Sequence, residues 1–118
     1  MLLYTRFLGA ETVRSGTVVL HHGRVKRPGK RIPDFSAVLL EPVARDPRGA
    51  LEALCSEAEA RFGLHQVLLA HRVGRLRAGE TVLVAVVSAA TRGRAFDGCR
   101  FLVERVKKEQ VIRLVEVP

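Results

Sequence analysis

The 118-residue sequence is poor in aromatic residues and in cysteine. Aromatics make up 5% of the chain and tryptophan is absent, so a core has to be built mainly from Val, Leu and Ala. Their scarcity also argues against a surface for single-stranded nucleic acid, where bases stack on aromatic rings. The two cysteines, Cys55 and Cys99, are far apart and neither lies in a Cys-x-x-Cys motif. We therefore expect buried free thiols rather than a disulfide or a zinc site.

Long apolar runs and nucleotide-binding motifs are also absent. No run reaches the length that spans a bilayer, and residues 1–7 lack the long apolar region and cleavage site of a signal peptide. A cytoplasmic protein is therefore expected. The sequence has no P-loop and no G-x-G-x-x-G motif. The pair His21-His22 has no third ligand at metal-binding spacing, so neither a metal nor a cofactor is expected.

Positive charge is what the chain has in excess. Lys and Arg number 20 against 12 Asp and Glu, which gives a formal net charge of +8. Such a balance implies an anionic partner, which could be nucleic acid, a phosphorylated metabolite or an acidic protein patch. A GC-rich or thermophilic source would account equally well for part of the arginine excess.

The cations are densest in residues 24–34, called the basic loop below. Pro28 and Pro33 exclude a helix or a central strand there, and no acidic residue occurs before Asp34. Self-repulsion predicts that this loop is mobile until an anion binds, when it could close over a phosphate. A solvated surface turn is the alternative interpretation. The five cations are Arg24, Lys26, Arg27, Lys30 and Arg31.

The pattern of apolar residues predicts a single α+β (mixed α/β) domain over residues 1–118, with two main helices packed on an antiparallel or mixed sheet. The continuous apolar runs at 67–70 and 82–87 predict strands that are buried on both faces. Asp46 and Thr91 are the expected N-caps of the two helices, and Gly63 should end the first. The other expected strands are residues 2–7, 17–20, 35–41 and 111–117, and the expected helices are about 47–62 and 91–108.

Polar and cationic residues stand where the predicted elements end. His71-Arg72 ends a buried strand, and strand ends are common places for a site. Arg92 lies in the first turn of the second helix, where free N–H groups already favour an anion. A cation there is most easily explained if an anion lies between the two. Lys107 follows the apolar position Val106, and an amine at the edge of a core can act as a nucleophile or general base.

Several motifs occur in order along the chain. They are a strand ending in His71-Arg72-x-Gly74, the turn Gly79-Glu80, the helix opening Ser88 to Phe96, the helix end Cys99 to Lys108, and the upstream segments Val18 to Lys26 and Ala60 to Leu64. In this combination the sequence resembles the MoaE family, the large, catalytic subunit of molybdopterin synthase. The resemblance implies an α/β-hammerhead-like sandwich.

The resemblance also implies a sulfurtransferase of molybdenum cofactor biosynthesis. Members of the family form a homodimer, and each protomer accepts a ubiquitin-like small subunit, which gives a heterotetramer. The C-terminal Gly-Gly thiocarboxylate of the small subunit delivers sulfur to cyclic pyranopterin monophosphate, which gains the dithiolene of molybdopterin. Neither a membrane nor a nucleic acid is an expected partner.

Residue roles follow from the same resemblance. Lys107 matches the family's first essential lysine, the catalytic residue near the thiocarboxylate. The phosphate and pterin are expected to contact side chains from several parts of the chain. These substrate-binding residues are His71, Arg72, Arg92, Lys26, Lys108 and Arg113.

After Lys108 the sequence departs from the family. The family's second essential lysine falls on Leu114, or on Arg113 if the register slips by one residue, and arginine cannot replace a lysine that must lose a proton. Lys26 stands where the family has an arginine, and Thr91 where it has a histidine. The alternative interpretation is therefore a weak or inactive paralogue that binds a ubiquitin-like partner or an anionic ligand.

Overall fold

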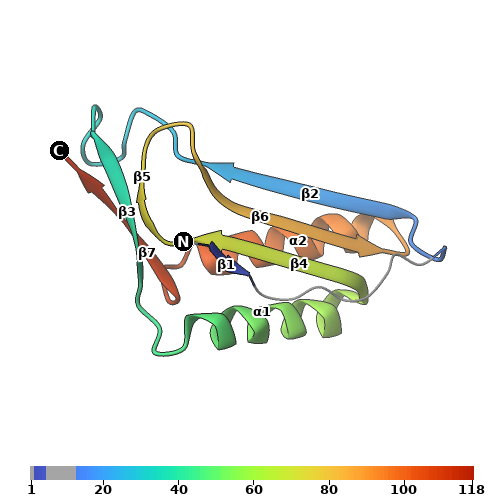
Figure 1. The fold of residues 1–118 in the computed structure, drawn as a ribbon. Helices are drawn as coiled ribbons and strands as arrows, with labels where there is room; N and C mark the ends of the chain where they lie inside the picture. Colours follow the sequence, from blue (N-terminus) through green and yellow to red (C-terminus); the bar gives the residue numbers. More distant parts are fainter. Residues whose placement is uncertain (1, 5–12) are drawn as a thin grey trace.

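The computed structural model describes residues 2–4 and 13–118, in which two helices cover one face of a four-stranded sheet (Figure 1). A second sheet, of three strands, stands at one end of the first. The predicted order of elements is confirmed, with the short strand β5 as an addition. The predicted strand 2–7 is seen over its first part, and residues 5–7 lie outside the described part of the chain. The strands are β1 (Leu2–Tyr4), β2 (Thr17–Arg24), β3 (Ala37–Pro42), β4 (Leu64–Arg72), β5 (Gly74–Leu76), β6 (Thr81–Ala89) and β7 (Ile112–Val117), and the helices are α1 (Pro47–Phe62) and α2 (Arg92–Val106).

Both sheets are antiparallel. The larger sheet has the order β1-β4-β6-β2 and the smaller one the order β5-β3-β7. Every described pair of strands runs antiparallel, so the antiparallel form of the predicted fold is the one found. β4 leads into β5 through the single residue Val73, which carries the chain from the first sheet to the second. β2 is an edge strand, and its outer edge has no strand partner among the described residues.

Local signals set the helix ends as the sequence predicts. The Asp46 side chain caps α1 by accepting a backbone N–H three residues later at 3.1 Å, and Gly63 ends the helix in the left-handed conformation with φ of 62°. Thr91 caps α2 in the same way. α2 ends at Val106, slightly earlier than predicted, so Lys107 is its C-cap. Within the described part of the chain, no helix is long and apolar enough to cross a lipid bilayer.

The core lies between the two helices and the larger sheet, and it extends to the smaller sheet through Val38, Leu40 and Leu76. Both cysteines are buried and free, as predicted. The predicted apolar stripes of the helices face inward, apart from Phe62, which is only partly buried. The buried helix positions are Leu51, Leu54, Cys55 and Ala58 of α1 and Ala95, Gly98, Cys99, Leu102, Val103 and Val106 of α2.

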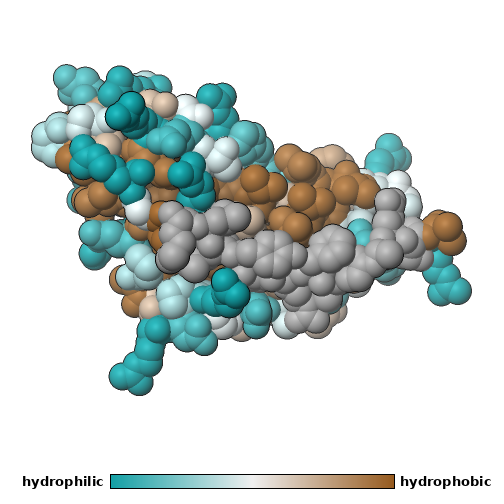
Figure 2. All heavy atoms as spheres, in the orientation of Figure 1, coloured by the Kyte–Doolittle hydropathy of each residue, from teal (hydrophilic) through white to brown (hydrophobic). Residues whose placement is uncertain are grey.

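The outer face of the larger sheet is only partly covered, so the predicted burial of β4 and β6 on both faces is wrong. Along β4, buried side chains alternate with half-buried ones such as Leu68, and β6 alternates in the same way as far as Val86. On β2, Val18 and Leu20 are 52% and 62% exposed. Figure 2 shows this apolar surface over β2 and β6. The reason is that both helices pack on the opposite face, as an antiparallel sheet allows.

Candidate functional site

A groove with a volume of about 410 Å³ lies between β2 and α2. One large apolar side chain on its rim, that of Phe96, is 56% exposed. Its charged lining residues are Arg100, Glu104 and Lys107. The β2–α2 groove therefore joins an apolar surface to a small number of charged groups, a combination typical of binding sites.

Lys107 lines this groove because it caps the C-terminus of α2. Its backbone N–H donates to the Val103 carbonyl at 3.1 Å, and its side chain shares the groove with His21. Burial lowers the pKa of His21, and the nearby Lys107 and His22 lower it further. The His21 imidazole is therefore mainly neutral near neutral pH, so the groove combines a primary amine with a group that can accept a proton.

The adjacent histidines of β2 point to opposite faces of the sheet, as neighbours on a strand do. The Nε2 of His22 lies 2.7 Å from the Thr81 hydroxyl oxygen, whereas His21 faces α2. They are therefore not a chelating pair, and the described residues contain no group of three or more His, Cys, Asp or Glu that could hold a metal. His21 was not predicted from the sequence as a residue of the site. The alternation of residues along β2 would have placed it on the same face as Val19.

Cys99 also lines the β2–α2 groove, but it is not a thiolate. Burial raises the pKa of its thiol, so the proton stays on the sulfur near neutral pH. A nucleophile in this groove is therefore an amine rather than a cysteine sulfur. A sulfur atom that reacts here has to be supplied by a ligand.

His71 lies on the helix-facing side of β4 and is 3% exposed. Its Nδ1 is 2.7 Å from the Arg72 carbonyl oxygen. Because a carbonyl only accepts, Nδ1 carries the proton, and Nε2 of the neutral ring is left as an acceptor. Burial lowers the pKa of His71, although the bond to the Arg72 carbonyl acts against this shift. Near neutral pH the buried His71 ring is therefore neutral and offers a hydrogen-bond acceptor rather than a positive charge.

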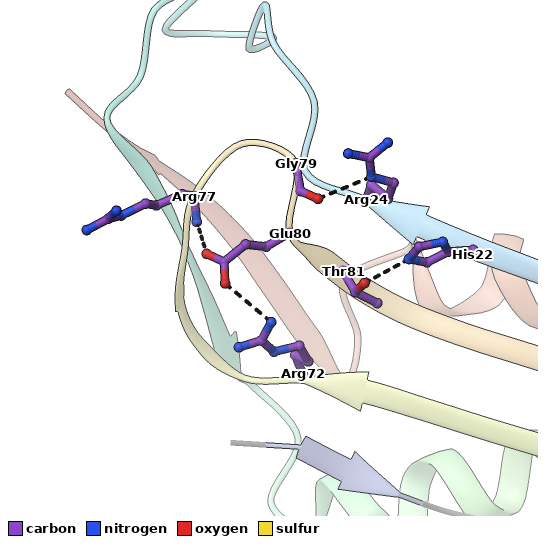
Figure 3. Close-up of polar contacts among 7 residues, drawn as sticks. All are labelled: His22, Arg24, Arg72, Arg77, Gly79, Glu80 and Thr81. Carbon is purple, nitrogen blue, oxygen red and sulfur yellow. Dashed lines mark hydrogen bonds and ion pairs between the residues drawn. The ribbon is translucent and has the colours of Figure 1, made fainter.

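Arg72, at the end of β4, is fixed by the turn that follows β5. Its guanidinium lies 3.5 Å from Glu80 Oε1, while Glu80 Oε2 accepts the Arg77 N–H at 2.6 Å (Figure 3). The Arg77 N–H and the Arg72 charge lower the pKa of Glu80, which stays ionised. Arg24 donates to the Gly79 carbonyl of the same turn at 3.1 Å. The turn thus holds two cations at the end of the sheet where β4 ends and β6 begins.

The basic loop is attached to the rest of the chain by side-chain and backbone contacts, and its mobility in the absence of a bound anion stays a prediction. Arg27 donates to the Phe35 carbonyl and stacks 5.2 Å over the Phe35 ring. Backbone N–H groups of residues 30–32 donate to the carboxylate of Glu116. The chain itself supplies the anion, from a position more than 80 residues away that sequence patterns do not connect to the loop. Lys26 remains exposed on this loop.

The other predicted site residues are dispersed. Arg92 is exposed at the N-terminus of α2, about 20 Å from Lys107 at the rise of an α-helix. Arg113, on β7, forms a 3.0 Å ion pair with Glu41 of β3. Lys108 is exposed in the turn after α2. One chain therefore brings Lys107 and His21 to one groove but leaves Arg92 at the other end of the helix.

Known proteins resemble the chain along most of its length. The model of the family described as MoaE protein matches residues 4–109. A molybdopterin synthase catalytic subunit from Pyrococcus abyssi is 41% identical over 58 residues, which are 49% of this chain and 39% of that protein. The chain spans less than half the length of the curated relatives that it matches first.

Solved structures share the fold. Molybdopterin synthase from Staphylococcus aureus gives a TM-score of 0.79 at 21% identity, over 91% of this chain and 77% of that one. A complex of subunits 1 and 2 of molybdopterin-converting factor from Helicobacter pylori gives a TM-score of 0.62 at 15% identity, over 87% and 66%. At these identities the two likenesses concern the fold alone.

Proposed function

The chain belongs to the MoaE protein family, and we propose that it acts as the large, catalytic subunit of a molybdopterin synthase. In this role it transfers sulfur from the C-terminal thiocarboxylate of a ubiquitin-like small subunit to cyclic pyranopterin monophosphate, which gains the dithiolene of molybdopterin. The observation that carries the proposal is the position of Lys107 in an apolar groove beside a neutral His21. A cytoplasmic location is part of the same proposal.

The β2–α2 groove suits an extended Gly-Gly tail. Such a tail has no side chains, so its backbone fits against the apolar surface formed by Val19, Phe96 and Val103. The terminal thiocarboxylate is an anion and pairs with the ammonium group of Lys107, which is exposed in this groove. Once the sulfur has bonded to a substrate carbon, water adds to the acyl carbon of the resulting thioester, and the acyl C–S bond breaks with its electron pair on sulfur. The tail leaves as a carboxylate, and the neutral His21 can accept the proton that the water loses.

The substrate phosphate is assigned to the cations at the end of the sheet where β4 ends. Arg72 is held there by Glu80, and Lys26 lies on the basic loop that begins at the same end. Lys108 follows Lys107 directly. Arg113 contributes least to this proposal, because its guanidinium is already paired with Glu41.

A homodimer completes the proposed site. Arg92 and Lys107 of one chain are too far apart to hold one ligand, but two copies with antiparallel α2 helices would bring the partner subunit's Arg92 close to Lys107. The exposed Leu20 and Phe96 and the unpaired outer edge of β2, within the described part of the chain, support a contact along this side. The tail of the small subunit would then enter at the Lys107 end of the groove.

The proposal is tested by product formation from the cyclic precursor and a thiocarboxylated small subunit. The chain should form the dithiolene, and Lys107→Ala should lower the rate by about 100-fold or more, the scale of losing one group that stabilises charge at the reacting centre. Arg48→Ala removes an exposed cation of α1 and should leave the rate unchanged. If an authentic large subunit forms product and this chain only binds the small subunit, the chain is instead the inactive binding protein that Leu114, at the second lysine position, suggests.

A further inference from the structure

Glu116 of β7 holds the basic loop through three backbone hydrogen bonds. Its Oε2 accepts the Lys30 N–H at 2.7 Å, and its Oε1 accepts the N–H groups of Arg31 and Ile32 at 2.9 Å and 2.7 Å. Successive N–H groups that converge in this way form a concave site for an anion. In this protein the anion that fills the site is part of the chain.

The basic loop is shaped to admit this carboxylate at close range. A Cβ atom at Gly29 would lie 2.5 Å from Glu116 Oε2 and 2.3 Å from the Ile32 carbonyl oxygen. Both distances are well below van der Waals contact, so a side chain at this position would displace either the carboxylate or the turn. The Gly29 N–H also closes the turn by donating to the Pro33 carbonyl at 3.1 Å.

The carboxylate is charged over the whole neutral range. Hydrogen bonds from the N–H groups of Ile32, Arg31 and Lys30 lower the pKa of Glu116, and the Arg31 charge acts in the same direction. Hydrogen bonds to an ionised acceptor are stronger than those between neutral groups. The contact is therefore a persistent anchor for the loop rather than an incidental surface pair.

The beginning of the basic loop has an anchor of its own. The Val25 N–H donates to the Glu80 carbonyl at 2.9 Å, and the Val25 carbonyl accepts the Gly79 N–H at 2.7 Å. Lys26 therefore lies on a short stretch between this fixed point and the segment that Glu116 holds. Release of the second anchor would leave this stretch held only by Val25 and by the contacts of Arg27 with Phe35.

We propose that Glu116 is a positioning residue, which holds the basic loop so that its cations form a fixed surface for the anionic substrate. The loop is then ordered before the substrate binds, and binding does not have to supply the entropy of ordering it. The identity of that substrate rests on the proposed function, whereas the anchor itself does not.

Hydrogen exchange of the amides at residues 30–32 tests the anchor. In Glu116→Gln, one acceptor oxygen becomes an N–H₂ group that faces backbone donors, so exchange at these amides should rise by about tenfold or more. Glu52→Gln, which removes an exposed carboxylate of α1, should leave it unchanged. Gly29→Ala should also raise exchange at these amides, because its Cβ would displace the Glu116 carboxylate without altering it. Unchanged exchange in both Glu116→Gln and Gly29→Ala would overturn the anchor.

Substrate affinity tests the positioning role separately. Calorimetric binding of cyclic pyranopterin monophosphate to Glu116→Gln should be weaker by about tenfold, and where turnover is measured KM should rise while kcat changes less than about twofold. Glu116→Asp keeps the charge and should recover part of the affinity. Faster exchange with unchanged affinity would overturn the positioning role. If the wild-type chain binds the precursor but forms no dithiolene, the proposed function fails, while the affinity of Glu116→Gln still decides the role of Glu116.

Discussion

At the scale of single residues, burial decides what the histidines can do. His21 and His71 both face the helices, and desolvation lowers the pKa of each. A neutral imidazole can accept a proton or a hydrogen bond, which an imidazolium cannot do. In the β2–α2 groove the fixed positive charge therefore comes from Lys107, and His21 serves proton transfer rather than charge.

The lowered pKa of His71 predicts a pH dependence of stability. The unfolded chain takes up a proton near the ordinary value of 6.5, and the folded chain only at a lower pH. In the window between these two values the unfolded state binds more protons, so the free energy of unfolding decreases as the pH falls. In His71→Gln, the free energy of unfolding should therefore depend less steeply on pH. Urea unfolding between about pH 5 and pH 8, the range in which His titrates, measures this dependence. His22→Gln is the control, and an unchanged slope in His71→Gln would contradict the assignment.

Single residues were predictable from the sequence when their signals were local. Both helix N-caps and both free cysteines needed only neighbouring residues to identify them, and Lys107 was found through a motif. Glu116 and His21 were missed because each acts on a group far along the chain. The excess of positive charge in the basic loop was predicted correctly, but the carboxylate of Glu116 that contacts the loop was not, because it lies on β7.

At the scale of the elements, α2 carries the site and depends on its packing. Leu102 is fully buried on the face opposite the solvent. Leu102→Ala should lower the free energy of unfolding by about 2–5 kcal/mol, because it removes buried methyl groups and leaves a cavity. Leu102→Met keeps the volume and should cost less than about 1.5 kcal/mol. Urea unfolding at one protein concentration measures the free energy of unfolding of both variants. If Leu102→Ala and Leu102→Met lost the same free energy, the loss would not come from packing.

Helices and long strands were predictable because their periodicity and their caps depend on residues that are close together in the sequence. β5 has only three residues, which are too few to show a period of apolar residues, so no sequence pattern predicts this strand. The division into two sheets was not foreseen either, because pairing joins segments as distant as β3 and β7. Its structural cause is local, however, since Val73 alone separates β4 from β5.

At the scale of the whole molecule, the proposed homodimer makes a sharp prediction. Arg92→Ala and Lys107→Ala should each be nearly inactive in product formation. Mixing the two variants after reversible dissociation should restore about a quarter of the wild-type rate, because half of the dimers are mixed and one of their two sites is intact. As the control, Lys107→Ala alone is dissociated and reassociated in the same way, and it should stay inactive. No recovery on mixing would show that Arg92 does not act across two chains.

The surface of the whole molecule was the least predictable level. Continuous apolar runs suggested that β4 and β6 are buried on both faces, yet Leu68 and Val86 are only partly buried. The apolar runs were correctly predicted to form strands, but they do not show which face of the sheet the helices pack against. Only the assembled layers show that the rim of the β2–α2 groove and the outer sheet face remain apolar.

The central claim is that sulfur leaves the small subunit at the Lys107 groove. The most direct measurement is the intact mass of a thiocarboxylated small subunit after incubation with the chain and the cyclic precursor. We predict that the C-terminal thiocarboxylate becomes a carboxylate only when both are present, and that Lys107→Ala prevents the conversion. A thiocarboxylate that stays intact with the wild-type chain, under conditions in which an authentic large subunit converts it, would contradict the claim.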